Sequence, residues 1–452
     1  MERTQRIAEF VAAADYARIP AAALQRAREA ILDSVGVALA GSREEASRIA
    51  AATAREEGSS PRASVIGHGF RASPMLASLV NGVSAHALDF DASFTIMGQP
   101  MSGLAPTVLA LSESAGASGR QLLQAYVAGF ELTAKLAWSM PAHAETGAWH
   151  GAGTLGTFGC TAAACNLLGL DAGKTVMALG IAGSMACGVV RNYGTMTKPL
   201  HAGLAARNGV LAARLAQQGH TASAAILQAP GGIYDSFARG MTLDPAVFDA
   251  LGRDFELEAG GVSIKPYPCG GLTHPAVDAV LGLRKEHGLA AKAIERIDVG
   301  ITPFTGKRIA YRIPQTGLQG KFSMAYVLAR TVIDGQLTLD TFTDAAVRDP
   351  GVLALAEKVH TALDPELAGY DRGIYPCKVS IRLADGRALF RRVDHPKGTP
   401  ESPLTADELR QKFLDCAGRV LEPAAAIETL DRLEQLHAQE TLHPLGRLLS
   451  GT

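Results

Sequence analysis

The sequence has no excess of charge of either sign. Its 452 residues include 43 Lys and Arg against 44 Asp and Glu, which gives a formal net charge of -1. A chain with so balanced a charge has no long-range field to attract a nucleic acid or an anionic membrane surface, so we expect neither partner. Any anion that it binds must be held by a few locally placed cations.

Clustered cysteines and long apolar runs are also missing. The six cysteines are scattered, and no two have the Cys-x-x-Cys spacing of zinc and iron–sulfur sites. We therefore expect free thiols, as in a reducing cytoplasm, and no metal site. No apolar run reaches the ~18 residues of a membrane span. The first residues lack the apolar core of a signal peptide, so we expect a cytoplasmic protein.

One glycine motif imitates a dinucleotide site. Residues 151–156 read Gly-Ala-Gly-Thr-Leu-Gly, which fits the G-x-G-x-x-G pattern. A dinucleotide site needs this loop to follow a buried strand, because the strand's end and the next helix together present backbone amides to the pyrophosphate. Residues 141–150 do not resemble a strand. Close helix packing explains the glycines better.

The length, about three times that of a usual domain, predicts two domains. From the start to about residue 264, apolar residues recur at steps of three and four, which is typical of amphipathic helices. One such helix begins after Pro20 and ends near Gly41. Ser118 has Gln121 three residues later, the form of a capping box, and Thr221 is a candidate N-cap.

Alternating patterns then replace the helical ones. Residues 297–301 read as a strand, and 379–383 with 389–393 read as a hairpin around Asp385-Gly386. A capping box at Thr405 and Glu408 begins the last helices, which we expect to pack on the first domain. The predicted fold class is therefore mainly α, with a large all-helical domain built from both chain ends, 1–264 and 396–452, and an inserted α/β domain, 265–395.

A first candidate site lies between Asn81 and Ser93. This stretch places His86, Asp89 and Asp91 among apolar neighbours. Burying a carboxylate is costly unless it is paired or hydrogen-bonded, and acid–base groups are often perturbed in such surroundings. The alternative is that one of the acids only caps a helix end.

Two further segments carry an imidazole and cations. His150 precedes a run of small residues, where a substrate carboxylate could accept backbone N–H groups at a helix start. Residues 194–198, Gly-Thr-Met-Thr-Lys, offer backbone amides, two hydroxyls and the Lys198 ammonium to a small dianion. The alternatives are a structural histidine and a solvated lysine in a turn.

The crossing between the two patterns supplies the last candidates. Residues 265–274 would carry His274 into a domain interface, where substrate sites are common. Cys269 near His274 suggests a thiol nucleophile, although Gly270-Gly271 more simply predicts a tight turn. Tyr326 is either a phenol donor or a buried structural residue.

In this order, the motifs resemble those of the MmgE/PrpD family over nearly the whole chain. The set is His86-Ala-Leu-Asp89-Phe-Asp91, Trp149-His150, Lys198, Lys265-Pro-Tyr-Pro-Cys269 with His274, and Lys321-Phe-Ser-x-x-Tyr326. The family includes 2-methylcitrate dehydratases, cis-aconitate decarboxylases and iminodisuccinate epimerases, which act on small polycarboxylates without a metal or organic cofactor. The resemblance implies a homodimer whose helical domain is covered by a smaller α/β lid, with the active site between the domains.

The resemblance also implies roles for eight residues. Catalytic roles fall on His150, Asp89, His274 and Tyr326, and substrate contacts fall on Lys198, Ser93, Gln99 and Lys265. Gln99 stands where the family's dehydratases and decarboxylases usually carry a histidine, and Ala92 stands where a second aspartate is usual. The glutamine amide cannot act as a general acid or base near neutral pH. Local stretches such as 192–199 look most like the epimerase branch.

These features predict a cofactor-independent lyase or isomerase that moves a proton α to a carboxylate of a small di- or tricarboxylate. The candidates are 2-methylcitrate dehydratase-like and iminodisuccinate epimerase-like activities. In this hypothesis Lys198 binds a carboxylate, His150 is the leading acid or base, and Asp89 orients a partner or shares the proton. The alternative is a non-catalytic or regulatory polycarboxylate binder that lost the chemistry through Gln99 and Ala92.

Overall fold

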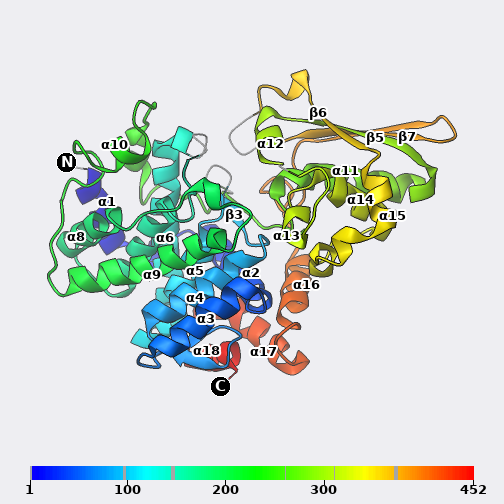
Figure 1. Ribbon diagram of the computed structural model, residues 1–452. Helices are drawn as coiled ribbons and strands as arrows, with labels where there is room; N and C mark the ends of the chain where they lie inside the picture. The colour runs from blue at the N-terminus through cyan, green and yellow to red at the C-terminus, as the bar shows by residue number, and fades with distance from the viewer. Residues whose placement is uncertain are drawn as a thin grey trace. The chain divides into compact units, whose positions relative to one another are not determined.

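The computed structural model describes residues 3–94, 98–143, 148–259, 261–309, 311–370 and 375–451. Its contacts divide the chain into two units, Met1–Ile264 with Thr405–Thr452 and Lys265–Leu404. Helices make up most of the structure (Figure 1), which confirms the mainly α fold class. In the described ranges, no helix is both long and apolar enough to cross a membrane.

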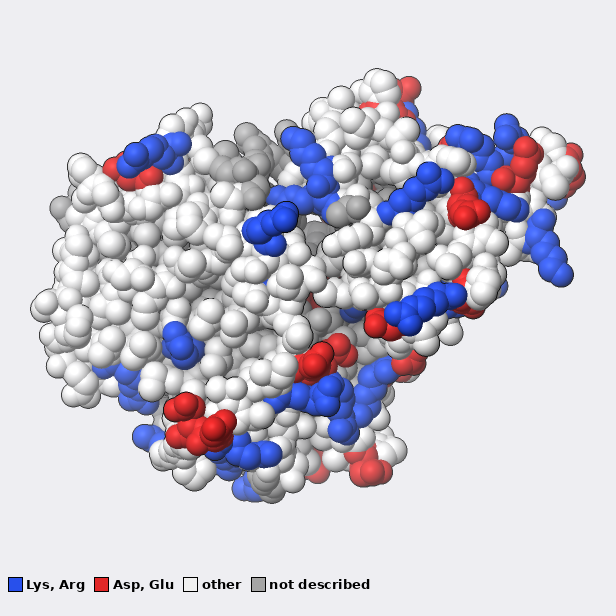
Figure 2. Space-filling model, viewed as in Figure 1, with Lys and Arg blue, Asp and Glu red and all other residues white. Residues whose placement is uncertain are grey.

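Charged side chains of both signs are interspersed on the surface. On the face shown in Figure 2, many Lys and Arg side chains lie beside Asp or Glu.

The first unit is a helical assembly built from both ends of the chain. Its N-terminal part contributes α1 (Arg3–Ala13), α2 (Ala21–Gly41), α3 (Glu45–Glu57), α4 (Pro74–Ala87), α5 (Met101–Ala115), α6 (Gly119–Ser139), α7 (Leu155–Leu167), α8 (Ala172–Gly183), α9 (Thr197–Gln217) and α10 (Ile233–Phe237). Its C-terminal part contributes α16 (Ala406–Ala417), α17 (Pro423–Glu434) and α18 (His443–Ser450). Helix α16 packs on α2, and α18 packs on the short strand β1 (Ala63–Val65).

Two glycines let α4 and α9 approach closely. A Cβ added to Gly82 on α4 would lie 2.8 Å from the Cα of Gly203 on α9. A Cβ on Gly203 would lie 2.4 Å from the carbonyl oxygen of Leu79. Larger residues would therefore push the helices apart. The crossing matters for the site because α4 ends near His86 and α9 begins near Lys198.

Short antiparallel strand pairs complete the first unit. Strand β1 pairs with β2 (Phe70–Ala72), and β3 (Ser93–Phe94) pairs with β4 (Val262–Ser263). The second pair places Ser93 opposite Ser263 and joins the segment after α4 to the end of the N-terminal part of this unit.

The second unit contains a four-stranded sheet in the order β6-β5-β7-β8. The strands are β5 (Ile294–Ile301), β6 (Val359–Leu363), β7 (Cys377–Leu383) and β8 (Ala388–Val393). Strand β6 runs parallel to β5, and the other pairings are antiparallel. The helices of this unit are α11 (His274–His287), α12 (Pro303–Arg308), α13 (Gly317–Gly320), α14 (Met324–Asp334) and α15 (Pro350–Ala356).

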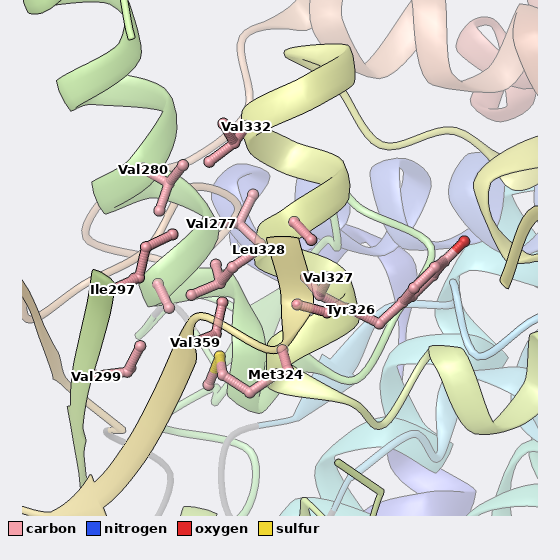
Figure 3. Packing of buried hydrophobic residues seen from close by; sticks show 14 of the residues in the cluster. Val277, Val280, Ile297, Val299, Met324, Tyr326, Val327, Leu328, Val332 and Val359 are labelled. Carbon is pink, nitrogen blue, oxygen red and sulfur yellow. The ribbon is translucent and has the colours of Figure 1, made fainter. Parts of the chain in front are cut away.

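Helices α11 and α14 supply much of the core that covers this sheet. Figure 3 shows Val277 and Val280 of α11 beside Ile297 and Val299 of β5, together with Leu328 of α14. All of these side chains are buried. The alternating burial of β7 agrees with a sheet that is covered on one face.

Most local predictions are confirmed. The capping boxes at Ser118 and Thr405 are both present, and the predicted hairpin is β7–β8. The N-cap prediction at Thr221 is wrong, because turns rather than a helix follow it and Pro230 with two glycines soon interrupts the segment. The sequence placed the return to the helical domain at residue 396, whereas residues 396–404 group with the second unit. There, the Lys397 amide donates to Asp278 Oδ2 at 2.6 Å.

Candidate active site

The site is centred on the turn that follows α4. His86 lies in the last turn of this helix, and Asp89 has a φ of 52°. Asp89 is the one non-glycine residue with a positive φ in the described part of the chain. This conformation costs an L-residue of order 1 kcal/mol or more, and such strain is concentrated at functional sites. The backbone conformation of Asp89 therefore indicates a functional site at this turn, independently of the side chains.

The carboxylate of Asp89 receives two donors. Lys198 Nζ lies 2.6 Å from Asp89 Oδ1, and Gln99 Nε2 donates to the same oxygen at 3.0 Å. All three residues are less than 9% exposed. The pair is thus a buried ammonium–carboxylate contact between the start of α9 and the turn after α4.

A second carboxylate orients His86. Asp91 Oδ2 accepts from His86 Nδ1 at 3.0 Å, and both side chains are fully buried. Gln99 Nε2 also lies 3.4 Å from Asp91 Oδ1, so one amide bridges both aspartates. In the neutral imidazole this bond places the proton on Nδ1 and the lone pair on Nε2. His86 Nε2 is buried and has no hydrogen-bond partner among the described residues.

His150 lies against His86 and His201. Its ring is stacked on His86 with centroids 5.4 Å apart, and its Nδ1 lies 3.1 Å from His201 Nδ1. Burial, followed by the charges of His86 and Lys198, lowers the pKa of His150 well below its ordinary 6.5. Burial likewise lowers the pKa of His201 to about 4. Both rings are therefore neutral near neutral pH, with one donating its Nδ1 proton to the other.

Tyr193 closes another side of this group. Its ring meets the edge of His150 at a centroid distance of 5.1 Å, and Lys198 Nζ lies 5.5 Å from its centroid. We refer to these eight residues as the His150 cluster: His86, Asp89, Asp91, Gln99, His150, Tyr193, Lys198 and His201.

The structure therefore brings four of the predicted site residues together: Asp89, Gln99, His150 and Lys198. Ser93 is half-buried in β3, four residues from Asp89. The sequence pattern placed His86 and Asp91 in a candidate segment without a specific role, and it did not point to Tyr193 or His201. His201 could have been found, because it lies three positions after Lys198 on the same helix, a spacing that puts both on one face.

The other predicted residues belong to the second unit. Lys265 is buried, and His274, the first residue of α11, has its Nε2 3.2 Å from the carbonyl oxygen of Cys269. The Tyr267 ring meets the edge of His274, and its hydroxyl donates to Asp278 at 2.6 Å. The roles predicted for Lys265 and His274 stay predictions.

Tyr326 is buried and hydrogen-bonded within the second unit. Its side chain is fully buried, and Figure 3 shows its hydroxyl directed away from the aliphatic cluster. The hydroxyl donates to the carbonyl oxygen of Thr341 and accepts from Arg330 Nε at 3.2 Å. These bonds fit the structural alternative, and the role as a substrate donor stays a prediction.

The chemistry of the His150 cluster is that of acids, bases and one cation. In the described residues, no group of three or more His, Cys, Asp or Glu side chains is arranged to hold a metal ion. Neutral imidazoles can accept a proton, and a buried ammonium can stabilise negative charge on a neighbour.

Two models of known protein families match the chain. The model of the MmgE/PrpD N-terminal domain matches residues 5–246, and that of the C-terminal domain matches residues 267–436. The chain belongs to the MmgE/PrpD family. The two matches follow one another along nearly all of the sequence, so family membership covers both units.

Several curated members of the family are similar over their length. The cis-aconitate decarboxylase of Mus musculus is 31% identical over 440 residues, covering 95% of this chain and 89% of that protein. The cis-aconitate decarboxylase of Homo sapiens is 30% identical, with 95% and 90% covered. The enzyme of the same name from Aspergillus terreus is 28% identical, with 96% and 92% covered.

Proposed function

We propose that this MmgE/PrpD protein is a lyase or isomerase that moves a proton at a carbon next to a carboxylate of a small di- or tricarboxylate. The observation that carries the proposal is the neutral, buried His150 in one cluster with the Lys198–Asp89 ion pair. A proton acceptor and a cation beside one another match a reaction that forms a carbanion or enediolate.

Lys198 supplies the charge for substrate binding. An ammonium has three N–H donors, and one of them meets Asp89 at 2.6 Å. The others can serve a substrate carboxylate. Lys198 is the second residue of α9, where the helix dipole also favours an anion. Binding there places negative charge in a buried region in which electrostatic interactions are strong.

His150 is the group that we assign to proton transfer. When its Nδ1 proton is donated to His201, Nε2 carries the lone pair that can accept a proton. The Asp89 carboxylate favours the charged form of His150, and it therefore stabilises the imidazolium after transfer. Asp89 thus interacts with both groups to which we assign roles: it pairs with Lys198 and stabilises protonated His150.

The relatives suggest the first substrate. They are named cis-aconitate decarboxylases, so cis-aconitate is the leading compound to test. The resemblance to the family keeps 2-methylcitrate as a further candidate, and the local stretches that look most like the epimerase branch keep iminodisuccinate. Gln99 bridges Asp89 and Asp91, and its amide cannot act as an acid or base near neutral pH, which leaves His86, His150 and His201 as the imidazoles of the site.

Proton NMR in D₂O tests the proposal with citrate, 2-methylcitrate, cis-aconitate, itaconate and iminodisuccinate. We expect turnover of one of these acids, with deuterium entering the carbon next to a carboxylate. Lys198→Met should raise KM strongly, and Lys174→Met, at an exposed position on α8, should not. Tight binding of an acid without turnover or label uptake would instead support the non-catalytic binder.

A further inference from the structure

A buried ion pair is hydrogen-bonded to the backbone of the loop after α4. Lys412 on α16 lies 2.5 Å from Asp33 Oδ1 on α2. Lys412 Nζ also donates to the carbonyl oxygen of Phe90 at 2.9 Å, and it lies 3.9 Å from the centroid of that ring. The C-terminal part of the chain thus reaches residue 90 directly.

Asp33, the other member of the pair, is hydrogen-bonded to the same loop. Asp33 Oδ2 accepts from the backbone N–H of Ala92 at 3.0 Å. The ion pair therefore bonds the carbonyl of residue 90 and the amide of residue 92, one on each side of Asp91. Asp91 in turn orients His86, and the strained Asp89 directly precedes Phe90.

We infer that Asp33 and Lys412 are positioning residues, through which helix α16 fixes the backbone that presents Asp89 and Asp91 to the His150 cluster. Both are almost completely buried, at 2% and 8% exposure. A buried ion pair loses much of its Coulomb energy to desolvation, so it is a weak device for stability alone. A positive φ at Asp89 persists only where surrounding contacts over-determine the backbone.

The packing around the pair supports this role. A Cβ on Gly36 of α2 would lie 3.0 Å from the Phe413 ring of α16, so the two helices are in close contact beside Lys412. An ion pair that only joined α2 to α16 would need no bonds to the loop. Here Asp33 and Lys412 each make one hydrogen bond to the loop, and both bonds are to backbone atoms that flank Asp91.

The consequence for activity rests on the proposed function. Lys412→Met should lower kcat at least ~10-fold with little change in KM, because Lys198 keeps its place on α9 while misplacement by about 1 Å can cost ~10²-fold in rate. Lys412→Arg should recover a large part of kcat, since a guanidinium can meet both Asp33 and the Phe90 carbonyl.

Two further variants separate positioning from stability. Asp33→Asn with Lys412→Met removes both buried charges, so its Tm should exceed that of Lys412→Met while kcat stays low. Arg71→Met removes the partner of the buried Glu113 on α5 and should lower Tm without lowering the kcat of the folded protein. If the double variant recovers both Tm and kcat, or Lys412→Met keeps kcat, the inference is wrong.

One readout needs no substrate. The His86 Nδ1 proton, bonded to Asp91, should give a downfield resonance that disappears in His86→Gln. We expect Lys412→Met to shift or broaden this resonance and Arg71→Met to leave it unchanged. A shifted resonance in a protein that acts on none of the acids would refute the proposed function and keep the positioning role. An unchanged resonance would refute the positioning role.

Discussion

The α4–α9 crossing offers a direct test of how the fold builds the site. Gly203→Ala would place a methyl group 2.4 Å from the carbonyl oxygen of Leu79 and 2.8 Å from a Val83 methyl group. Contacts this short force the helices apart, and such overpacking typically costs ~1–3 kcal/mol. Alanine also favours a helix over glycine by ~1 kcal/mol, which offsets part of that cost. We therefore expect a net loss of stability of up to about 2 kcal/mol.

The effect on activity should be larger than the effect on stability. Lys198 is five residues from Gly203 on the same helix, and its partner Asp89 follows α4. A shift of α9 by a few tenths of an ångström to 1 Å would lengthen the 2.6 Å contact between them, and rates can fall ~10²-fold on such a scale.

Urea unfolding and steady-state kinetics measure the two effects. Gly173→Ala on α8 is the matched control, because the nearest atom to its Cβ would be 3.4 Å away and the helix should gain stability. Unchanged stability and activity in Gly203→Ala would refute the view that this close crossing sets the geometry of the His150 cluster.

Further predictions concern buried groups outside or beside the site. Burial raises the pKa of Glu131 to about 8, so the folded protein keeps a proton that the unfolded chain releases above about 4.5. The unfolding free energy should then fall by up to ~1.4 kcal/mol per pH unit between about pH 5 and 8. Glu131→Gln should remove this slope in urea titrations, and the exposed Glu258→Gln should keep it. Tyr326→Phe should cost ~1–3 kcal/mol by leaving the Thr341 carbonyl without its donor. A large drop in the kcat of folded Tyr326→Phe would show that the hydroxyl also meets substrate.

The sequence predicted best what local rules decide. The capping boxes at Ser118 and Thr405 and the hairpin around Asp385-Gly386 depend on neighbours within a few residues, and all three are present. The parallel pairing of β5 with β6 joins residues about 60 positions apart, and no short sequence pattern predicts it.

The site was predictable in its residues more than in its contacts. The family motifs pointed to Asp89, Gln99, His150 and Lys198, which the structure brings together. The bond between His86 and Asp91 and the support from Lys412 depend on a tertiary contact across 322 residues and on side-chain directions. Spacing along the chain does not encode either of them.

His150 is the residue that we propose moves the proton. The direct measurement is the rate of deuterium entry into the accepted acid, next to its carboxylate, by wild-type protein and by His150→Gln. We expect a loss of ~10²–10⁴-fold in His150→Gln and no loss in His220→Gln, the same change at an exposed position. A His150→Gln variant that exchanges label as fast as the wild type would show that His150 does not move the proton.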